Sequence, residues 1–323
     1  MLVVSLDFEL LWGMADHEPL ENAHRFSEVH NVVPRILDLF KKYEIHATWA
    51  TVGALMAHDD EEFFSFLPDA LPPQTDYVLR RLGLHPLLRT DALPRNVVYA
   101  PNLIEMIADT PGQEIGSHTY THYYCNLKSS RPEDFKNEIR AANRIAEKNG
   151  FACTSVVFPR NRFSSEYVKV LSNEGITAFR GHERDSWLTA FSKLSWDLFR
   201  VFDKLDNYFA MERNMPYPME ELVMMGNVVN VNSSRFFKPY TERLGKLEPL
   251  KRHRFRRELV KAAKCGEIYH IYWHPHNFLE DVEKNLETLE WFLRAFSVMR
   301  DRYGMLSCSM AEVAALYKRE GVE

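Results

Sequence analysis

The sequence predicts an α/β fold in which parallel strands alternate with helices and close into a barrel. Short apolar runs are mostly followed by helical patterns, which is how parallel strands are connected. About seven such units occur, enough to close a barrel. The alternative is an open doubly wound sheet, but the sequence contains neither G-x-G-x-x-G nor G-x-x-x-x-G-K-[ST] to support a nucleotide-binding fold.

The predicted strands are short runs bounded by polar residues or glycine. The first, LVVSLDF, is rich in residues that favour strands, and EIYHIYWH near the C-terminus is similar. In chain order the predicted strands are 2–8, 46–53, 113–118, 155–161, 176–181, 267–274 and 305–309.

Helical patterns separate these strands. The clearest is 131–150, which has Pro132 near its start, Phe135 and Ile139 on one face, and Gly150 as its end. Further helices are predicted within 32–45, 165–175, 283–304 and 310–320.

Two stretches interrupt the alternation of strands and helices. Residues 58–100 are acidic and rich in proline, and residues 183–260 contain aromatic, methionine-rich and polar segments. Neither has the pattern of a separate core. We therefore predict one domain over 1–323, with both stretches as insertions that frame the site.

Bulk properties narrow the class of protein. The net charge of −5 argues against general nucleic-acid binding, and no apolar run approaches the roughly 18 residues of a membrane span. The first residues lack a basic segment and acquire charge at Asp7 and Glu9, unlike a signal peptide. The four cysteines are scattered without a C-x-x-C motif, as expected for buried thiols in a reducing compartment. We expect a cytoplasmic protein of unknown oligomeric state.

Polar side chains gather where the predicted strands end. In a parallel barrel these ends meet on one face, where barrel enzymes place their active sites. The residues concerned are Asp7, Glu9, His118, His122, Arg160, Asn161, His274 and His276. Carboxylates, imidazoles and a guanidinium are therefore expected to converge from four different strands.

The spacing of His118 and His122 alone is weak evidence, because His270 and His274 show the same spacing. On a helical turn, residues four apart direct both imidazoles to the same side, as metal binding requires. Asp7 and Glu9 share a face if the chain stays extended, and two carboxylates so placed repel each other unless a cation or a proton lies between them. His270 is expected to lie in the barrel wall.

Four motifs in this order, SLDFEL, GQEIGSHTYTH, VVFPRNRF and YWHPHNF, resemble those of the polysaccharide deacetylases of the NodB-homology type, carbohydrate esterase family four. The resemblance covers about 2–317 and is closest to a subgroup met in bacterial surface-polysaccharide gene clusters. It implies a distorted (β/α)7 barrel and one divalent metal, usually zinc, with cobalt, manganese or iron as alternatives.

The resemblance also implies roles for individual residues. Glu9, His118 and His122 would be metal ligands, Asp7 the general base, His274 the general acid, and Arg160 the residue that orients Asp7. Two motifs depart from the family pattern. The family has two adjacent aspartates where this chain has Asp-Phe-Glu, and proline precedes arginine in FPRNR, which leaves Arg162 as an alternative to Arg160.

The implied reaction removes an N-acetyl group from an amino sugar or glycan, such as a surface-polysaccharide or nucleotide-sugar precursor. Asn161, His276, Trp12 and Trp273 are the predicted substrate-binding residues. The basic run 250–264 could dock a diphosphate or an anionic membrane face, or form a solvated helix face. The alternatives are another C–N hydrolase acting on a small amide, a glycoside hydrolase using Asp7 and Glu9, and a sugar-binding pseudoenzyme.

Overall fold

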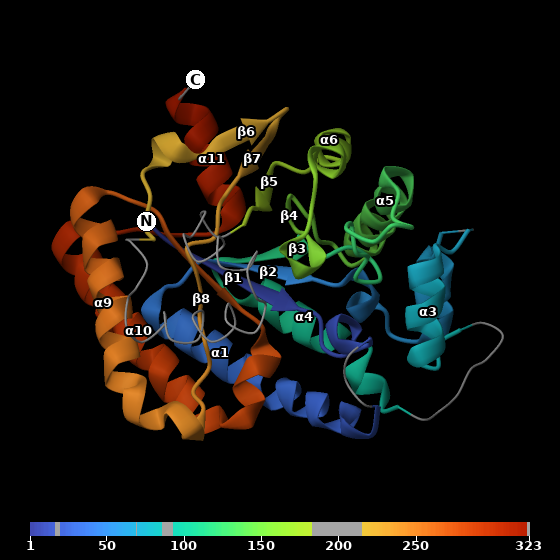
Figure 1. Ribbon diagram of the computed structural model, residues 1–323, viewed down its shortest axis with the longest axis horizontal. Coiled ribbons are helices and arrows are strands. Elements are labelled where there is room, and N and C mark those ends of the chain that lie inside the picture. Colours follow the sequence, from blue (N-terminus) through green and yellow to red (C-terminus); the bar gives the residue numbers. More distant parts are fainter. Residues whose placement is uncertain (17–19, 69, 86–92, 183–214, 322–323) are drawn as a thin grey trace, which may run out of the picture.

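A computed structural model of the chain describes residues 1–16, 20–68, 70–85, 93–182 and 215–321. Its centre is one curled sheet, and helices surround it (Figure 1). The strands run in the order β6-β7-β5-β4-β3-β2-β1-β9-β8, and β10 pairs with the start of β1. Their bounds are β1 (Leu2–Phe8), β2 (Ala47–Thr51), β3 (Gln113–Ser117), β4 (Ser155–Val157), β5 (Ala178–Arg180), β6 (Val223–Met225), β7 (Val228–Asn230), β8 (Arg235–Phe236), β9 (Tyr269–Trp273) and β10 (Ser307–Cys308).

One segment, 228–236, joins the two edges of the parallel sheet. β7 pairs in parallel with β5, and β8 pairs in parallel with β9. The backbone N–H of Val231 donates to the carbonyl of Phe179 at 2.9 Å, and that of Ser234 donates to the carbonyl of His270 at 2.7 Å. Segment 228–236 acts as one strand of the barrel beside β5, β4, β3, β2, β1 and β9. The described strands thus form the distorted (β/α)7 barrel that the sequence predicts.

Helices cover the outside of the sheet. Figure 1 shows α1, α9 and α10 grouped on one side of the strands, with α5 and α6 on another. The bounds are α1 (Val29–Tyr43), α2 (Asp60–Phe66), α3 (Pro73–Arg81), α4 (Pro101–Asp109), α5 (Pro132–Lys148), α6 (Ser165–Asn173), α9 (Glu248–Cys265), α10 (Val282–Tyr303) and α11 (Met310–Glu320). None of these described helices is long and apolar enough to cross a membrane.

Strand β1 lies in the middle of the sheet and is buried along its whole length. Its even-numbered residues pack into the main core with the outer helices. Val3 instead packs with α11, and Ser5 and Asp7 bond to Arg180 across the barrel. Successive side chains of a strand point to opposite faces, so β1 directs Asp7 toward the barrel interior.

The predicted second insertion is wrong in part. Within 183–260 the described residues from 223 onward supply β6, β7, β8 and most of α9, and 183–214 lie outside the described residues. The strands here are only two or three residues long, too short to give a periodic signal in the sequence. The predicted last strand at 305–309 is reduced to β10, while α2 and α3 form in 58–100.

Candidate active site

The carboxyl ends of the parallel strands bring most of the predicted residues together. Asp7 lies near the end of β1 and Glu9 just after it, and His118 follows β3. His274 directly follows β9, and its Nε2 lies 3.5 Å from an oxygen of Asp7 and 3.5 Å from an oxygen of Glu9. The expected convergence on one face is therefore present.

Glu9, His118 and His122 form a compact group of possible metal ligands. Glu9 Oε2 lies 3.3 Å from His118 Nε2 and 3.0 Å from His122 Nε2. One ligand atom from each of the three lies within 4.8 Å of the others, and all three side chains are buried. A carboxylate with two imidazoles is a donor set that suits a divalent transition metal and leaves further coordination positions open.

The hydrogen bonds of His118 support this interpretation. Its Nδ1 lies 2.8 Å from the carbonyl oxygen of Val157, so in the neutral ring Nδ1 carries the hydrogen and donates it. Nε2 of His118 then directs a lone pair at Glu9. Because His118 Nε2 and Glu9 Oε2 are both acceptors and lie 3.3 Å apart, a proton or a cation is needed between them. A histidine that ligates a metal is commonly oriented in this way by its other nitrogen.

The spacing of His118 and His122 predicts a helical turn, but the two histidines do not lie on one. Residues 118–124 form an irregular loop in which Thr119 and His122 have φ values of 63° and 61°. Left-handed backbone is uncommon for residues with a side chain and often occurs at functional sites. The loop, rather than helical periodicity, directs the rings to one side, with centroids 4.9 Å apart.

Gly13 makes room for the Glu9 carboxylate. A Cβ atom at position 13 would lie 2.0 Å from Cδ of Glu9 and within 2.3 Å of both its oxygens. The chain turns back at Leu10, which has φ of 44°, so the residues after β1 fold over Glu9. Only glycine fits against the carboxylate here.

Asp7 is bound by Arg180, which the sequence interpretation missed. Nη1 and Nη2 of Arg180 donate to the two carboxylate oxygens at 2.6 and 2.7 Å, and the guanidinium is fully buried. Ser5 Oγ accepts from Nη1 at 3.0 Å, and the guanidinium lies 4.2 Å over the ring of Tyr272. Arg180 ends β5, so the rule that polar residues at strand ends converge would have found it.

Arg160 does not occupy the predicted place beside Asp7. Its Nη2 donates to both oxygens of Asp16, at 3.0 and 2.7 Å, and the guanidinium lies 4.5 Å over the Tyr124 ring. Left-handed φ values at Arg160 and Asn161, 57° and 51°, turn the chain here. Asn161 is nevertheless near the base, because its Oδ1 accepts from Arg180 at 2.8 Å.

The two tryptophans predicted to bind substrate lie in the hydrophobic core. Trp12 is buried, and its Nε1 donates to the carbonyl of Val98 at 2.8 Å. Trp273 is fully buried and stacks on Phe278 with centroids 6.0 Å apart. Trp273 belongs to the face of β9 that packs on the outer helices, so its ring offers no surface to a sugar. Both assignments are therefore corrected.

His276 and His270 are held neutral by burial. Burial, together with the charge of His274, lowers the pKa of His276 to about 3. Its ring packs 4.9 Å from that of His274 and 5.4 Å from Phe26. Burial and the charge of Arg180 lower the pKa of His270 to about 3, and its Nε2 lies 2.8 Å from Ser5 Oγ. His270 thus lies in the barrel wall, as expected.

The carboxyl groups of Asp7 and Glu9 are held ionised although both are buried. Burial alone would raise the pKa of Asp7, but Arg180, followed by His274 and His118, brings this pKa below its usual value. Burial opposes ionisation of Glu9 as well, and His274 and His122 lower the pKa of Glu9 well below its usual value. Burial also lowers the pKa of His122, which favours the neutral imidazole that a metal requires.

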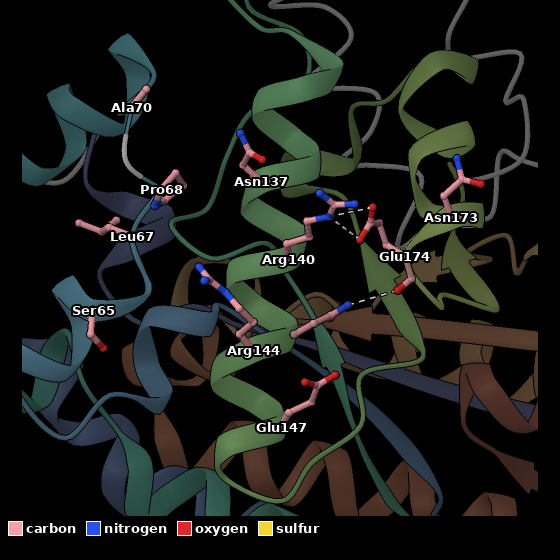
Figure 2. Close-up of a pocket in the computed structure, with 11 residues that line it drawn as sticks. Ser65, Leu67, Pro68, Ala70, Asn137, Arg140, Arg144, Glu147, Asn173 and Glu174 are labelled. Carbon is pink, nitrogen blue, oxygen red and sulfur yellow. Dashed lines mark hydrogen bonds and ion pairs between the residues drawn. The ribbon is translucent and has the colours of Figure 1, made fainter.

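A separate groove of about 740 Å³ lies on the outer face of α5, between the region after α2 and the end of α6. Figure 2 shows Arg140 paired with Glu174 across it, with Arg144 and Asn137 along the same helix. None of the predicted site residues lines this groove. It is therefore distinct from the group at the strand ends.

Barrel and site together define a hydrolase class in which a buried carboxylate–histidine group lies beside an ionised aspartate. The family model for polysaccharide deacetylase matches residues 16–179, just over half of the chain. The chain belongs to the polysaccharide deacetylase family, whose enzymes hydrolyse N-acetyl amide bonds of acetylated sugars and depend on a metal. It is accordingly a hydrolase of C–N bonds other than peptide bonds. No curated protein matches the chain.

Solved structures share the fold at low sequence identity. A putative polysaccharide deacetylase from Mycobacterium smegmatis is 14% identical, with a TM-score of 0.60 over 99% of this chain and 91% of the other. A probable polysaccharide deacetylase from Pseudomonas aeruginosa PAO1 is 14% identical, with a TM-score of 0.54 over 100% and 91%. Puue allantoinase is 12% identical, with a TM-score of 0.54 over 100% and 90%.

Proposed function

We propose that the chain is a metal-dependent N-deacetylase in which Glu9, His118 and His122 hold one divalent cation. The observation that carries the proposal is Glu9 Oε2 between two imidazole Nε2 atoms, at 3.3 and 3.0 Å. The lone pair that His118 directs at Glu9 and the ionised Glu9 carboxylate suit a cation between them, and neutral His122 can supply a further nitrogen ligand. Zinc is the metal that two imidazoles and a carboxylate favour, with cobalt, manganese and iron as alternatives.

A divalent cation in this group would polarise the acetamide carbonyl and lower the pKa of water toward neutrality. Asp7 is the general base, because Arg180 holds it ionised and fixes both of its oxygens. Ser5 and Asn161 hold Arg180 in turn. Asp7 would take a proton from the attacking water while Arg180 keeps the Asp7 carboxylate in a fixed orientation.

His274 is the general acid of the proposal. Its side chain is 23% exposed, more than Asp7 or Glu9, and its Nε2 lies 3.5 Å from an oxygen of each. Nδ1 lies 3.2 Å from Oδ1 of Asn277, which orients the ring. An imidazolium between two carboxylates and an open side of the site can donate its proton to the departing amine. The products are acetate and an amino sugar.

The proposed substrate is an N-acetylated amino sugar, in a glycan or in a surface-polysaccharide or nucleotide-sugar precursor. The family supports acetylated sugars, and a cytoplasmic enzyme would meet the precursor rather than a finished polymer. Asn161 and His276 are the predicted substrate-binding residues that remain near the site. The net charge of −5 gives no support for a nucleic-acid partner.

The test measures bound metal and acetate release together. Purified protein and the His118→Ala/His122→Ala variant are analysed for metal by mass spectrometry, then assayed on N-acetylated sugar oligomers, N-acetylated nucleotide sugars and allantoin. We expect about one metal per chain, lost in the variant, and acetate release from a sugar substrate. Metal without acetate release, but with hydrolysis of allantoin, would favour the small-amide alternative. Absence of metal after zinc is added would favour the pseudoenzyme.

A further inference from the structure

The loop that carries the two histidines, 118–124, takes its shape from contacts with other elements as well as from its own hydrogen bonds. It has no regular secondary structure, and two of its residues, Thr119 and His122, have left-handed backbone. Such a conformation persists only where the surroundings determine it. The backbone hydrogen-bonding groups of a buried loop must also find partners. Tyr123 donates its N–H to the Thr119 hydroxyl at 2.7 Å within the loop, and the N–H groups of residues 53 and 54 each donate at 2.9 Å to the carbonyls of residues 119 and 120. Further partners lie on helices α3 and α5. These partners show what fixes the positions of the imidazoles.

Helix α3, in the predicted first insertion, holds one end of this loop. The side-chain amide of Gln74 accepts from the backbone N–H of Tyr124 at 2.8 Å and donates to the carbonyl of Tyr124 at 3.1 Å. One amide thus bonds both backbone groups of Tyr124, whose carbonyl also accepts from the Ser130 hydroxyl at 2.7 Å. The Tyr124 ring contacts that of His122, with centroids 5.2 Å apart, so Gln74 acts next to the second histidine.

Helix α5 holds the middle of the loop through a fully buried carboxylate. Glu138 accepts from the backbone N–H of Thr121 and from its hydroxyl, each at 2.7 Å. Thr75 of α3 adds its hydroxyl, 3.4 Å from Glu138 Oε1 and 3.3 Å from the hydroxyl of Thr121. Thr121 lies between His118 and His122 in the chain, so these contacts bear on both.

We infer that Gln74, Thr75 and Glu138 form a polar clamp that positions the 118–124 loop for metal binding. The inference rests on the proposed function, because it assumes that the loop supplies metal ligands. The clamp residues touch neither the reacting atoms nor the ligands' nitrogens, so they are positioning residues. Part of the first insertion therefore supports the metal site itself.

The first test measures affinity for zinc in Gln74→Ala and Glu138→Gln by competition with a chelator. Removal of an outer-shell partner typically weakens metal affinity at least tenfold, so we expect a loss of about tenfold in Gln74→Ala and a smaller loss in Glu138→Gln, which keeps one acceptor. Tyr77→Ala on α3 and Glu133→Gln on α5, both at exposed positions, are matched controls. Affinity in Gln74→Ala within about twofold of the original protein would overturn the inference.

A second measurement separates the clamp from the proposed function. Hydrogen exchange of the Tyr124 and Thr121 amides is followed in metal-free protein, where the clamp acts without a cation. We expect faster exchange at Tyr124 in Gln74→Ala, with no change in the amides of α10. If the original protein binds no metal but this local change occurs, the proposed function fails while the clamp remains. An unchanged exchange rate of the Tyr124 amide in Gln74→Ala would overturn the clamp. If Glu138→Gln does not fold, the result for Gln74→Ala alone tests the inference.

Discussion

Asp7 and Glu9 are two residues apart in the chain, yet their surroundings differ in kind. Asp7 is fixed by the guanidinium of Arg180, which donates to both of its carboxylate oxygens. Glu9 faces two imidazoles, whose nitrogens are ligands for a metal as readily as they are proton carriers. The Asp7 carboxylate is therefore held by a cation of the protein itself, while the Glu9 carboxylate is placed to bind a metal cation. Four experiments test this difference between Asp7 and Glu9.

The largest effect is expected from Arg180→Met. Removing one partner of a buried ion pair leaves Asp7 as an uncompensated buried charge, which costs about 3 kcal/mol of stability. The base would lose its orientation as well, so we expect kcat for acetate release to fall by about 100-fold or more. Thermal unfolding and steady-state kinetics measure the two effects. A variant with full activity would remove Arg180 from the account.

Gly13→Ala tests the position of the Glu9 carboxylate without changing any of the proposed metal ligands. The new Cβ would collide with the Glu9 carboxylate, which must move away from the histidines. We expect zinc affinity to fall by about tenfold to about 100-fold, with the Asp7–Arg180 pair intact. Chelator competition gives the affinity. Unchanged binding would show that the Glu9 carboxylate is not held where the structure places it.

The pH dependence of stability should follow the Asp7–Arg180 pair. The folded-state pKa of Asp7 is lowered from 3.8, so its contribution is fully present above this unfolded value and is lost as pH falls through the lower, folded one. We expect the free energy of unfolding to drop below about pH 4 in the original protein, and less steeply in Asp7→Asn. Urea titrations across this range measure it. Parallel curves for the two proteins would contradict the assignment.

The smallest effect is expected from Arg160→Ala. Arg160 bonds to Asp16 at a partly exposed position rather than to the base, and such pairs contribute roughly 0.2–1 kcal/mol. We therefore expect kcat to change by less than about tenfold, far less than in Arg180→Met. A loss as large as that of Arg180→Met would return the orienting role to Arg160.

The sequence predicted the barrel, and it predicted that most of the candidate site residues lie together, because strand ends in parallel sheets converge. This rule placed Asp7, Glu9, His118 and His274 correctly in the chain relative to the strands. It was not applied to Arg180, which ends the short strand β5, and Arg160 was preferred because it also lies at the end of a predicted strand.

Other errors have local physical causes. Trp273 was chosen for its place near a strand end, although alternation along β9 puts it on the face opposite His270 and Tyr272. The closing segment 228–236 was hidden in a predicted insertion because its strands are too short for periodicity to be read. The left-handed residues Thr119 and His122 depend on contacts from other elements, which spacing in the sequence cannot reveal.

The most direct test of the different roles of Asp7 and Glu9 measures bound metal and acetate release in Asp7→Asn and in Glu9→Gln. We predict that Asp7→Asn keeps about one metal per chain and loses acetate release, because the base is gone while the ligands remain. Glu9→Gln should lose both metal and activity. Equal metal loss in the two variants, or full acetate release by Asp7→Asn, would contradict the separation of the two carboxylates.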